Sequence, residues 1–316
     1  MGEVKSFRLN YSRDTRSAFT IVELLAVLFV LALLGLALLP ALASTHPNVQ
    51  ATRCINNMRQ LGAALAMYSH DNFDLLPPNF DPGNATPGEA WVMGNASGWM
   101  PTITGGGSPD AGDPKFTTNA SYSLLAPYLG NRPEPFQCPL DPRICPYSGS
   151  DSSSTGKPIK VVRNVALNGG VGTNPHKGWP ATIKVDGAWL DGNHSHVADT
   201  PYATFGKMSD FRNVRPADTW TFVDADPWTI ASGEMAVIAA VPDTVDYCNA
   251  LHGNATPFAF ADGRAEMHKW KSTVWVHKGP PSRTTFQAMA ASGAGREDWF
   301  WWASHATKSF KTGTVP

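Results

Sequence analysis

The sequence predicts an α+β protein in which a long N-terminal helix packs on a head built on an antiparallel β-sheet with long loops. Three observations support this fold class. Residues 24–39 are all apolar or glycine, as in a helix that lies in an apolar environment. Residues 48–71 carry apolar side chains every three or four positions, the period of one helix face. Residues 257–270 read as two strands joined by Asp262-Gly263, a strong hairpin signal.

The N-terminal helix is expected over residues 19–43. As a helix this segment would span about 37 Å, more than the ~30 Å hydrocarbon core of a bilayer, so it is predicted to cross a membrane. Residues 1–18 hold four basic and two acidic residues, and a positive segment before an apolar helix stays in the cytoplasm. The body of the protein is therefore expected on the outer side of the inner membrane, in a single-pass topology.

One acidic residue, Glu23, interrupts the apolar run. A carboxylate at the centre of a bilayer costs at least ~2.5 kcal/mol, so such a residue is first interpreted as functional. The alternative is that Glu23 lies at the headgroup level and is solvated, because it is close to the end of the run.

Residues 18–23, Ala-Phe-Thr-Ile-Val-Glu, resemble the cleavage and methylation motif of type IV prepilins and pseudopilins. The resemblance implies that a prepilin peptidase removes residues 1–18 as a leader and methylates the new amine of Phe19. It also implies that Glu23 pairs with this amine in a neighbouring subunit, and that Pro40 is the proline that kinks the helix. Ala18 departs from the family, which most often has glycine there.

An ordinary secretory signal peptide is the competing interpretation. Residues 24–39 would be its apolar core, and Ala-Leu-Ala at 41–43 would be an acceptable cleavage site. The product would be a secreted or membrane-anchored binding protein, for example for polysaccharide. The acidic residue within the apolar run, and the Phe-Thr pair directly after the charged leader, favour the prepilin interpretation.

The next segment, residues 44–76, is expected to be a separate amphipathic helix that joins the head. Ser-Thr-His-Pro at 44–47 is a signal for a helix restart. The apolar face that follows consists of Ile55, Met58, Leu61, Leu65 and Tyr68.

The globular head is assigned to residues 77–316. Residues 77–115 are rich in glycine and proline and are expected to form a long loop, pinned to the core by Trp91 and Trp99. Strands are predicted over 160–167 and 219–224.

The hairpin within residues 257–270 is predicted to have a two-residue turn. This turn would place Phe258 opposite Met267 and Phe260 opposite Ala265, giving one apolar face.

Nine residues lie between His252 and Asp262-Gly263. This spacing, with the segments at 54–72 and 121–141, resembles a pseudopilin-like group that carries an H-X9-DG motif. His252, Asp262 and His268 could also be drawn as a catalytic or metal cluster. However, the hairpin turn explains Asp262, and a polar strand face explains His268.

No nucleophile–base pairing, nucleotide-binding loop or catalytic triad motif is present. The sequence therefore predicts that the protein is not an enzyme. Its net charge of −1 gives no basic footprint for nucleic acid.

An even number of cysteines in an exported chain permits disulfides, and four cysteines allow three pairings. A local bridge is possible between two of them across a proline-rich turn, and a bridge from the first to the second or the fourth would staple the long helix to the head. No spacing in the chain resembles a zinc site. The candidates are Cys54, Cys138, Cys145 and Cys248.

Two further features have alternative interpretations. Asp224 and Asp226 follow a predicted strand and are candidate calcium ligands, since calcium takes oxygen ligands; the alternative is a solvated acidic loop. No other cofactor is expected. The aromatic tail at 299–302 is either a subunit or carbohydrate contact surface, or packs on the sheet.

Together these observations predict a structural subunit of a type IV pilus or a type II secretion-like filament. Its expected partners are copies of itself, other pilin-like subunits, the prepilin peptidase and the inner membrane. The assembled filament is expected in the periplasm or at the cell surface.

Overall fold

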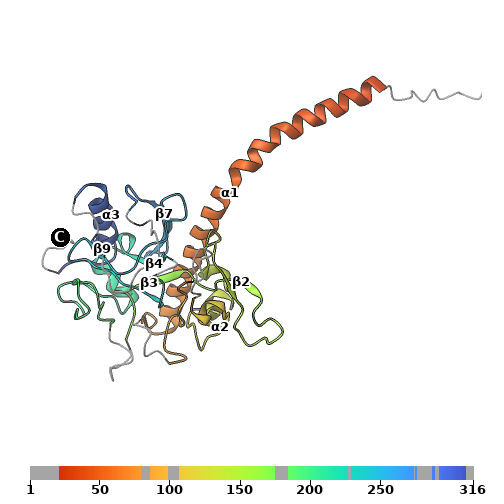
Figure 1. Ribbon diagram of the computed structural model, residues 1–316. Coiled ribbons are helices and arrows are strands. Elements are labelled where there is room, and N and C mark those ends of the chain that lie inside the picture. Colours follow the sequence, from red (N-terminus) through yellow and green to blue (C-terminus); the bar gives the residue numbers. More distant parts are fainter. Residues whose placement is uncertain are drawn as a thin grey trace, which may run out of the picture. The chain divides into compact units, whose positions relative to one another are not determined.

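The computed structural model describes residues 21–79, 86–98, 107–174, 184–226, 229–273, 275, 287–288 and 292–310. Within residues 32–48 only the helical backbone is described. The chain divides into two compact units, Met1–Asn48 and Val49–Pro316. The order of the elements can be followed by colour in Figure 1.

A single helix, α1, runs from Ile21 to Asp71 over 51 residues. The predicted restart at residues 44–47 is wrong, because these residues continue the helix. A proline inside a helix removes one backbone donor and costs about 3 kcal/mol. Pro40 and Pro47 nevertheless both lie within α1.

The prediction of a transmembrane helix over residues 19–43 is corrected by the structure. Among the described residues, no helix combines the length and the apolar character needed to cross a membrane. The described apolar side chains at the start of α1 cover residues 21–31, about 16 Å of helix against a ~30 Å hydrocarbon core. The predicted fold, a membrane helix carrying an antiparallel head, is wrong in this respect.

Within the second unit, α1 is amphipathic as its spacing predicts. Met58, Leu61 and Leu65 are at most 2% exposed and pack in one cluster with Phe222 and Ala259 of the sheet. Burying such side chains stabilises by roughly 1.5–3 kcal/mol each. This face therefore fixes the last five turns of α1 on the head.

The body is α+β and is organised on a five-stranded sheet with the order β5-β3-β4-β7-β8. Neighbouring strands are antiparallel except β3 and β5, which run parallel. The sheet is therefore mixed and not purely antiparallel as predicted, because the connection from β4 returns the chain beside β3 in the same direction. The strands are β3 (Val165–Asn168), β4 (Trp220–Asp224), β5 (Glu234–Met235), β7 (Ala255–Phe260) and β8 (Ala265–Lys269).

Two small sheets and several short helices complete the described part of the head. The paired strands are β1 (Ile144–Pro146) with β2 (Pro158–Lys160), and β6 (Asp243–Thr244) with β9 (Gln287–Ala288). The helices are η2 (Pro109–Gly112), α2 (Lys115–Thr118), η3 (Pro127–Leu129), η4 (Glu134–Phe136), η5 (Met208–Asn213), η6 (Pro216–Asp218) and α3 (Gly293–Ser304).

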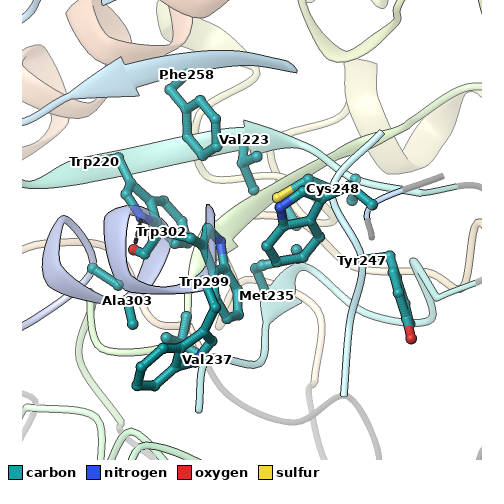
Figure 2. Close-up of a cluster of buried hydrophobic side chains, with 14 of the residues drawn as sticks. Trp220, Val223, Met235, Val237, Tyr247, Cys248, Phe258, Trp299, Trp302 and Ala303 are labelled. Atoms are coloured by element: carbon teal, nitrogen blue, oxygen red, sulfur yellow. Dashed lines mark hydrogen bonds between the residues drawn. The ribbon is translucent and has the colours of Figure 1, made fainter. Parts of the chain in front are cut away.

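The central sheet is buried on both faces. α1 covers one face and α3 the other, and Figure 1 shows β3 and β4 between them. Figure 2 shows the α3 side, where Trp302 stacks on Trp220 and the Trp220 indole N–H donates to the Trp302 carbonyl (3.1 Å). Trp299 is 1% exposed. The aromatic tail therefore packs on the sheet rather than forming a Trp-lined contact surface.

The β7–β8 hairpin forms, but its predicted register is wrong by one residue. Phe258 pairs with Glu266, and the Phe260 N–H donates to the Arg264 carbonyl (2.9 Å). The connection is a three-residue loop that ends at Gly263, whose φ of +87° is the left-handed conformation glycine adopts readily. A type I turn followed by such a glycine is the common three-residue hairpin loop.

A buried ion pair joins several loops of the head. The side chains of Arg143 and Asp141 are 0% and 3% exposed, and Arg143 Nη2 lies 2.7 Å from Asp141 Oδ2. The Arg143 guanidinium also donates to backbone carbonyls of Ala96, Gly98 (3.4 Å) and Arg163 (3.3 Å). One guanidinium thus organises three segments that have no regular secondary structure.

Candidate metal centre

Four side chains with metal-ligating atoms meet inside the head, between α1 and the end of the central sheet. One ligand atom from each lies within 4.8 Å of all the others. The Cys54 and Cys138 sulfurs are 3.3 Å apart, and Cys138 Sγ is 3.3 Å from His252 Nε2. Both cysteines and Asp224 are buried, and His252 is half-buried. Among the described residues, this is the group of three or more such side chains that could hold an ion.

Helix α1 and a tight turn supply the two thiols. Cys54 is 2% exposed and lies one helical turn before Met58, on the face that packs on the head. Cys138 follows η4 in the segment Cys-Pro-Leu-Asp, where the Asp141 N–H donates to the Cys138 carbonyl (3.0 Å). The Cys138 N–H donates to Asn164 Oδ1 (2.7 Å), which fixes this turn against the start of β3.

The carboxylate comes from Asp224, the last residue of β4. Asp224 is 0% exposed. Its Oδ1 accepts from Asn249 Nδ2 (3.2 Å), and the Cys138 thiol is close enough to affect the carboxyl group, but Oδ2 has no well-formed hydrogen bond among the described residues. Burying a polar oxygen without a good hydrogen bond is costly. This oxygen is therefore one sign that a further group belongs at the site.

His252 lies in the tight turn that leads into β7. Gly253 and Asn254 both have positive φ, +67° and +64°, and the Asn254 N–H donates back to the Ala250 carbonyl (3.1 Å). Glycine and asparagine are the residues that enter this conformation most readily. The turn thus presents the imidazole toward Cys138 instead of continuing the strand.

The surroundings of the site favour the protonated, neutral forms of the Cys138 thiol and the Asp224 carboxyl group. The hydrogen bond with Cys54, followed by burial, raises the pKa of the Cys138 thiol. Burial and the neighbouring Cys138 sulfur raise the pKa of Asp224. Burial lowers the pKa of His252, so its imidazole is held neutral. A bound divalent cation inverts this balance, because it deprotonates thiols and favours carboxylate.

The donor set fits a borderline-soft ion and does not fit calcium. Thiolate, imidazole and carboxylate together are ligands of zinc, whereas calcium takes only oxygen ligands. Asp224 therefore belongs to a different kind of site from the calcium site considered from the sequence. Asp226 is outside the four-residue group, and its N–H donates to the Tyr247 carbonyl (2.8 Å).

All four cysteines are free in the structure. A disulfide requires an S–S distance of ~2.05 Å, and the Cys54 and Cys138 sulfurs are 3.3 Å apart. Cys145 packs instead with Ala111 and Val161, and Cys248 lies in the cluster under α3. The bridges considered from the sequence are absent, although the first and second cysteines do meet.

The H-X9-DG spacing corresponds to one strand with a turn at each end. His252 precedes β7, and Asp262-Gly263 follows it in the hairpin loop, with a strand length of about 20 Å between them. The ring of His268 stacks on Trp301, with centroids 3.5 Å apart. The cluster of His252, Asp262 and His268 that could be drawn from the sequence is therefore not formed.

The residues predicted for processing and assembly lie mostly outside this part of the protein. Ala18 and Phe19 are outside the described residues. Glu23 is an exposed residue in the first turn of α1, and Pro40 is described only as helical backbone.

Sequence reasoning missed the four-residue site because its members are far apart in the chain and share no local spacing. Two signals pointed to it. The sequence singled out Cys54 and Cys138 as a possible staple, and His252 as part of a motif without a role. Comparisons of the chain with protein-family models, with characterised proteins and with solved structures find no match.

Proposed function

We propose that the protein is a structural subunit of a filament of the type IV pilin-like class, either a pilus or a secretion pseudopilus. In this proposal a prepilin peptidase removes residues 1–18, and copies of the chain associate through the N-terminal part of α1 into a periplasmic or cell-surface filament. The protein acts by assembly, and no reaction is assigned to it.

The observation that carries the proposal is the exposed apolar surface at the start of α1. Ile21 is 74% exposed, Val22 70% and Phe29 65%. The six leucines and valines from Leu24 to Leu31 are about half exposed. Covering such a side chain stabilises by roughly 1.5–3 kcal/mol. A contiguous apolar patch of this kind marks an interaction surface, and equivalent helices of neighbouring copies would cover it.

In this proposal Glu23 sets how far neighbouring copies are shifted along one another. Its carboxylate lies in the first turn of α1 among apolar side chains. When such a helix is surrounded by others, a carboxylate there needs a cationic partner. Cleavage before Phe19 creates a new ammonium group four residues away, and the ammonium of a neighbouring copy is the partner that sets the stagger between subunits.

The test is the variant Glu23→Ala in the native host, with filaments counted by electron microscopy. We expect assembly to be lost while the melting temperature of the head stays unchanged, because the variant removes the interaction between copies only. Asp71→Asn is the matched control, since it removes a carboxylate at the other end of the same helix and should leave filaments intact. Wild-type numbers of filaments from Glu23→Ala would overturn the proposal.

N-terminal sequencing and intact mass of the native protein test the processing step. We expect a chain that begins at N-methylated Phe19. A chain that begins at Ser44 would contradict filament assembly, because the apolar part of α1 would be gone. It would favour a secreted binding protein. The ligand of such a protein would have to bind elsewhere than at the buried tryptophans of the head.

A further inference from the structure

We propose that Cys54, Cys138, Asp224 and His252 bind one zinc ion that fixes helix α1 to the head. The site is separate from filament assembly, so this inference does not rest on the proposed function. It follows from the donor set, from the distances between the ligand atoms and from a buried oxygen that lacks a well-formed hydrogen bond.

The distances match a tetrahedral ion with little adjustment. With Zn–S near 2.3 Å and Zn–N or Zn–O near 2.1 Å, the ligand atoms of a tetrahedral site lie about 3.3–3.8 Å apart. The Cys54–Cys138 and Cys138–His252 separations are both 3.3 Å, and every separation in the group is at most 4.8 Å. Small side-chain rotations close the remaining gap.

The ligand chemistry selects the metal. Two thiolates and an imidazole favour zinc over magnesium or calcium. Four protein ligands fill a tetrahedral shell and leave no open position, which is typical of structural rather than catalytic zinc. The Cys54 and Cys138 thiol protons, and the proton of Asp224 where it is present, are released to solvent when the ion binds.

Asn249 and Asn164 hold the ligands from outside the site. Asn249 donates its side-chain amide to Asp224 Oδ1, and its own Oδ1 accepts from the Leu251 N–H (3.0 Å) in the turn that carries His252. Asn164 accepts from Cys138, and its carbonyl accepts from the Ala225 N–H (2.8 Å). Such outer contacts orient ligands before the metal arrives.

A Cys54–Cys138 disulfide is the competing use of the same residues. It would employ only two of the four side chains. It would leave Asp224 Oδ2 buried without a donor and would give His252 no role. The zinc site satisfies all four side chains, and for that reason we prefer it.

The ion would join α1 to three separate segments of the head. Cys54 lies near the beginning of the second unit, which starts at Val49, and the other ligands come from the turn after η4, the end of β4 and the turn before β7. Removing the metal is therefore expected to loosen α1 around Cys54 before it affects the sheet.

The first experiment is elemental analysis of the full chain, purified under reducing conditions and supplied with Zn²⁺. We expect about one tightly bound zinc per chain. Cys54→Ser, Cys138→Ser, Asp224→Asn and His252→Gln should each lose it. The matched controls Cys145→Ser, Cys248→Ser, Asp226→Asn and His268→Gln should each retain it.

Two readouts on the wild-type chain keep the test valid if a ligand variant fails to fold. Co²⁺ in place of zinc should give thiolate-to-cobalt charge-transfer absorption and tetrahedral d–d bands. Chelation should speed hydrogen exchange of the α1 amides near Cys54 by about tenfold or more, and Zn²⁺ should reverse this.

Three results would overturn the proposal. One is a chain that binds no zinc with all thiols reduced. Another is zinc retained equally by the ligand variants and the controls. The third is a native chain two mass units lighter, without metal, whose Cys54 and Cys138 peptides are joined.

Discussion

Removing one partner of the buried pair between Asp141 and Arg143 should strongly destabilise the head. In Asp141→Asn the guanidinium of Arg143 stays fully buried and loses the carboxylate of Asp141. A second buried guanidinium, Arg163, lies close enough that Arg143 contributes, after burial, to lowering its pKa to about 9. Breaking a buried ion pair costs about 3–5 kcal/mol, and we expect the same for Arg143→Met, which leaves the carboxylate alone.

The double variant distinguishes two contributions to the free energy of unfolding. One is the cost of burying a charge after its partner is removed, and the other is the net contribution of the ion pair itself. When both charges are replaced, in Asp141→Leu with Arg143→Met, neither member of this pair is left buried without the other. Replacing a buried pair with apolar residues is often nearly neutral. We therefore expect the double variant to be more stable than either single variant, with a large coupling energy in the double-mutant cycle.

Chemical denaturation of the full chain, followed by tryptophan fluorescence, measures these differences. A loss of 3–5 kcal/mol corresponds to a decrease in melting temperature of about 6–20 °C for a domain of this size. Glu297→Gln is the control, because it removes an exposed partner of Lys271 and should cost less than about 1 kcal/mol. Single variants as stable as this control, or a double variant as unstable as the sum of both, would refute the reasoning.

Two further predictions concern histidine and glycine. Burial lowers the pKa of His268 to about 4, so between pH 6.5 and 4 the unfolded chain binds a proton that the folded chain does not. Stability should fall as pH decreases through this window. In His268→Phe this pH-dependent change in the free energy of unfolding, measured by urea denaturation, should be smaller by about 1–3 kcal/mol at most, given the partial exposure of His268. Gly62→Ala should raise the melting temperature, because the added methyl makes ordinary contacts with Ala259 and with the Gly263 Cα, both at 3.9 Å, and alanine is favoured in a helix by about 1 kcal/mol. Gly112→Ala should lower it, because the methyl would meet the Pro146 carbonyl at 2.1 Å; equal melting temperatures for the two glycine variants would contradict the packing argument.

Elements set by local periodicity could be predicted from the sequence, and those set by tertiary context could not. The apolar face of α1 at Met58, Leu61 and Leu65 follows from spacing. Strand β4 follows from a short run of β-branched and aromatic residues. The hairpin was predicted to exist, but Asp262-Gly263 fits a two-residue turn and a three-residue loop alike, so the register was missed. The restart signal at residues 44–47 was misleading, because the helical backbone of α1 continues through them; serine, threonine and proline before a helix favour a start but do not enforce one.

The candidate metal centre shows the same limit more sharply. No pair among Cys54, Cys138, Asp224 and His252 is close in sequence, and each residue has an ordinary explanation when considered alone. Only the fold brings a helix, a strand end and two turns to one point. The buried oxygen of Asp224 has no signature in sequence at all, because it depends on which donors fail to reach it.

The two turns at the ends of β7 make the spacing between His252 and Asp262 a measure of strand length. Adding or deleting one residue in β7 would exchange the side chains that face α1 with those that face α3, and would shift the imidazole by about 3 Å relative to the cysteines. Substitutions of similar size in β7 leave the distance intact. Across related chains, this stretch should therefore tolerate changes of residue type far better than insertions or deletions, even if the residues at its two ends never act together.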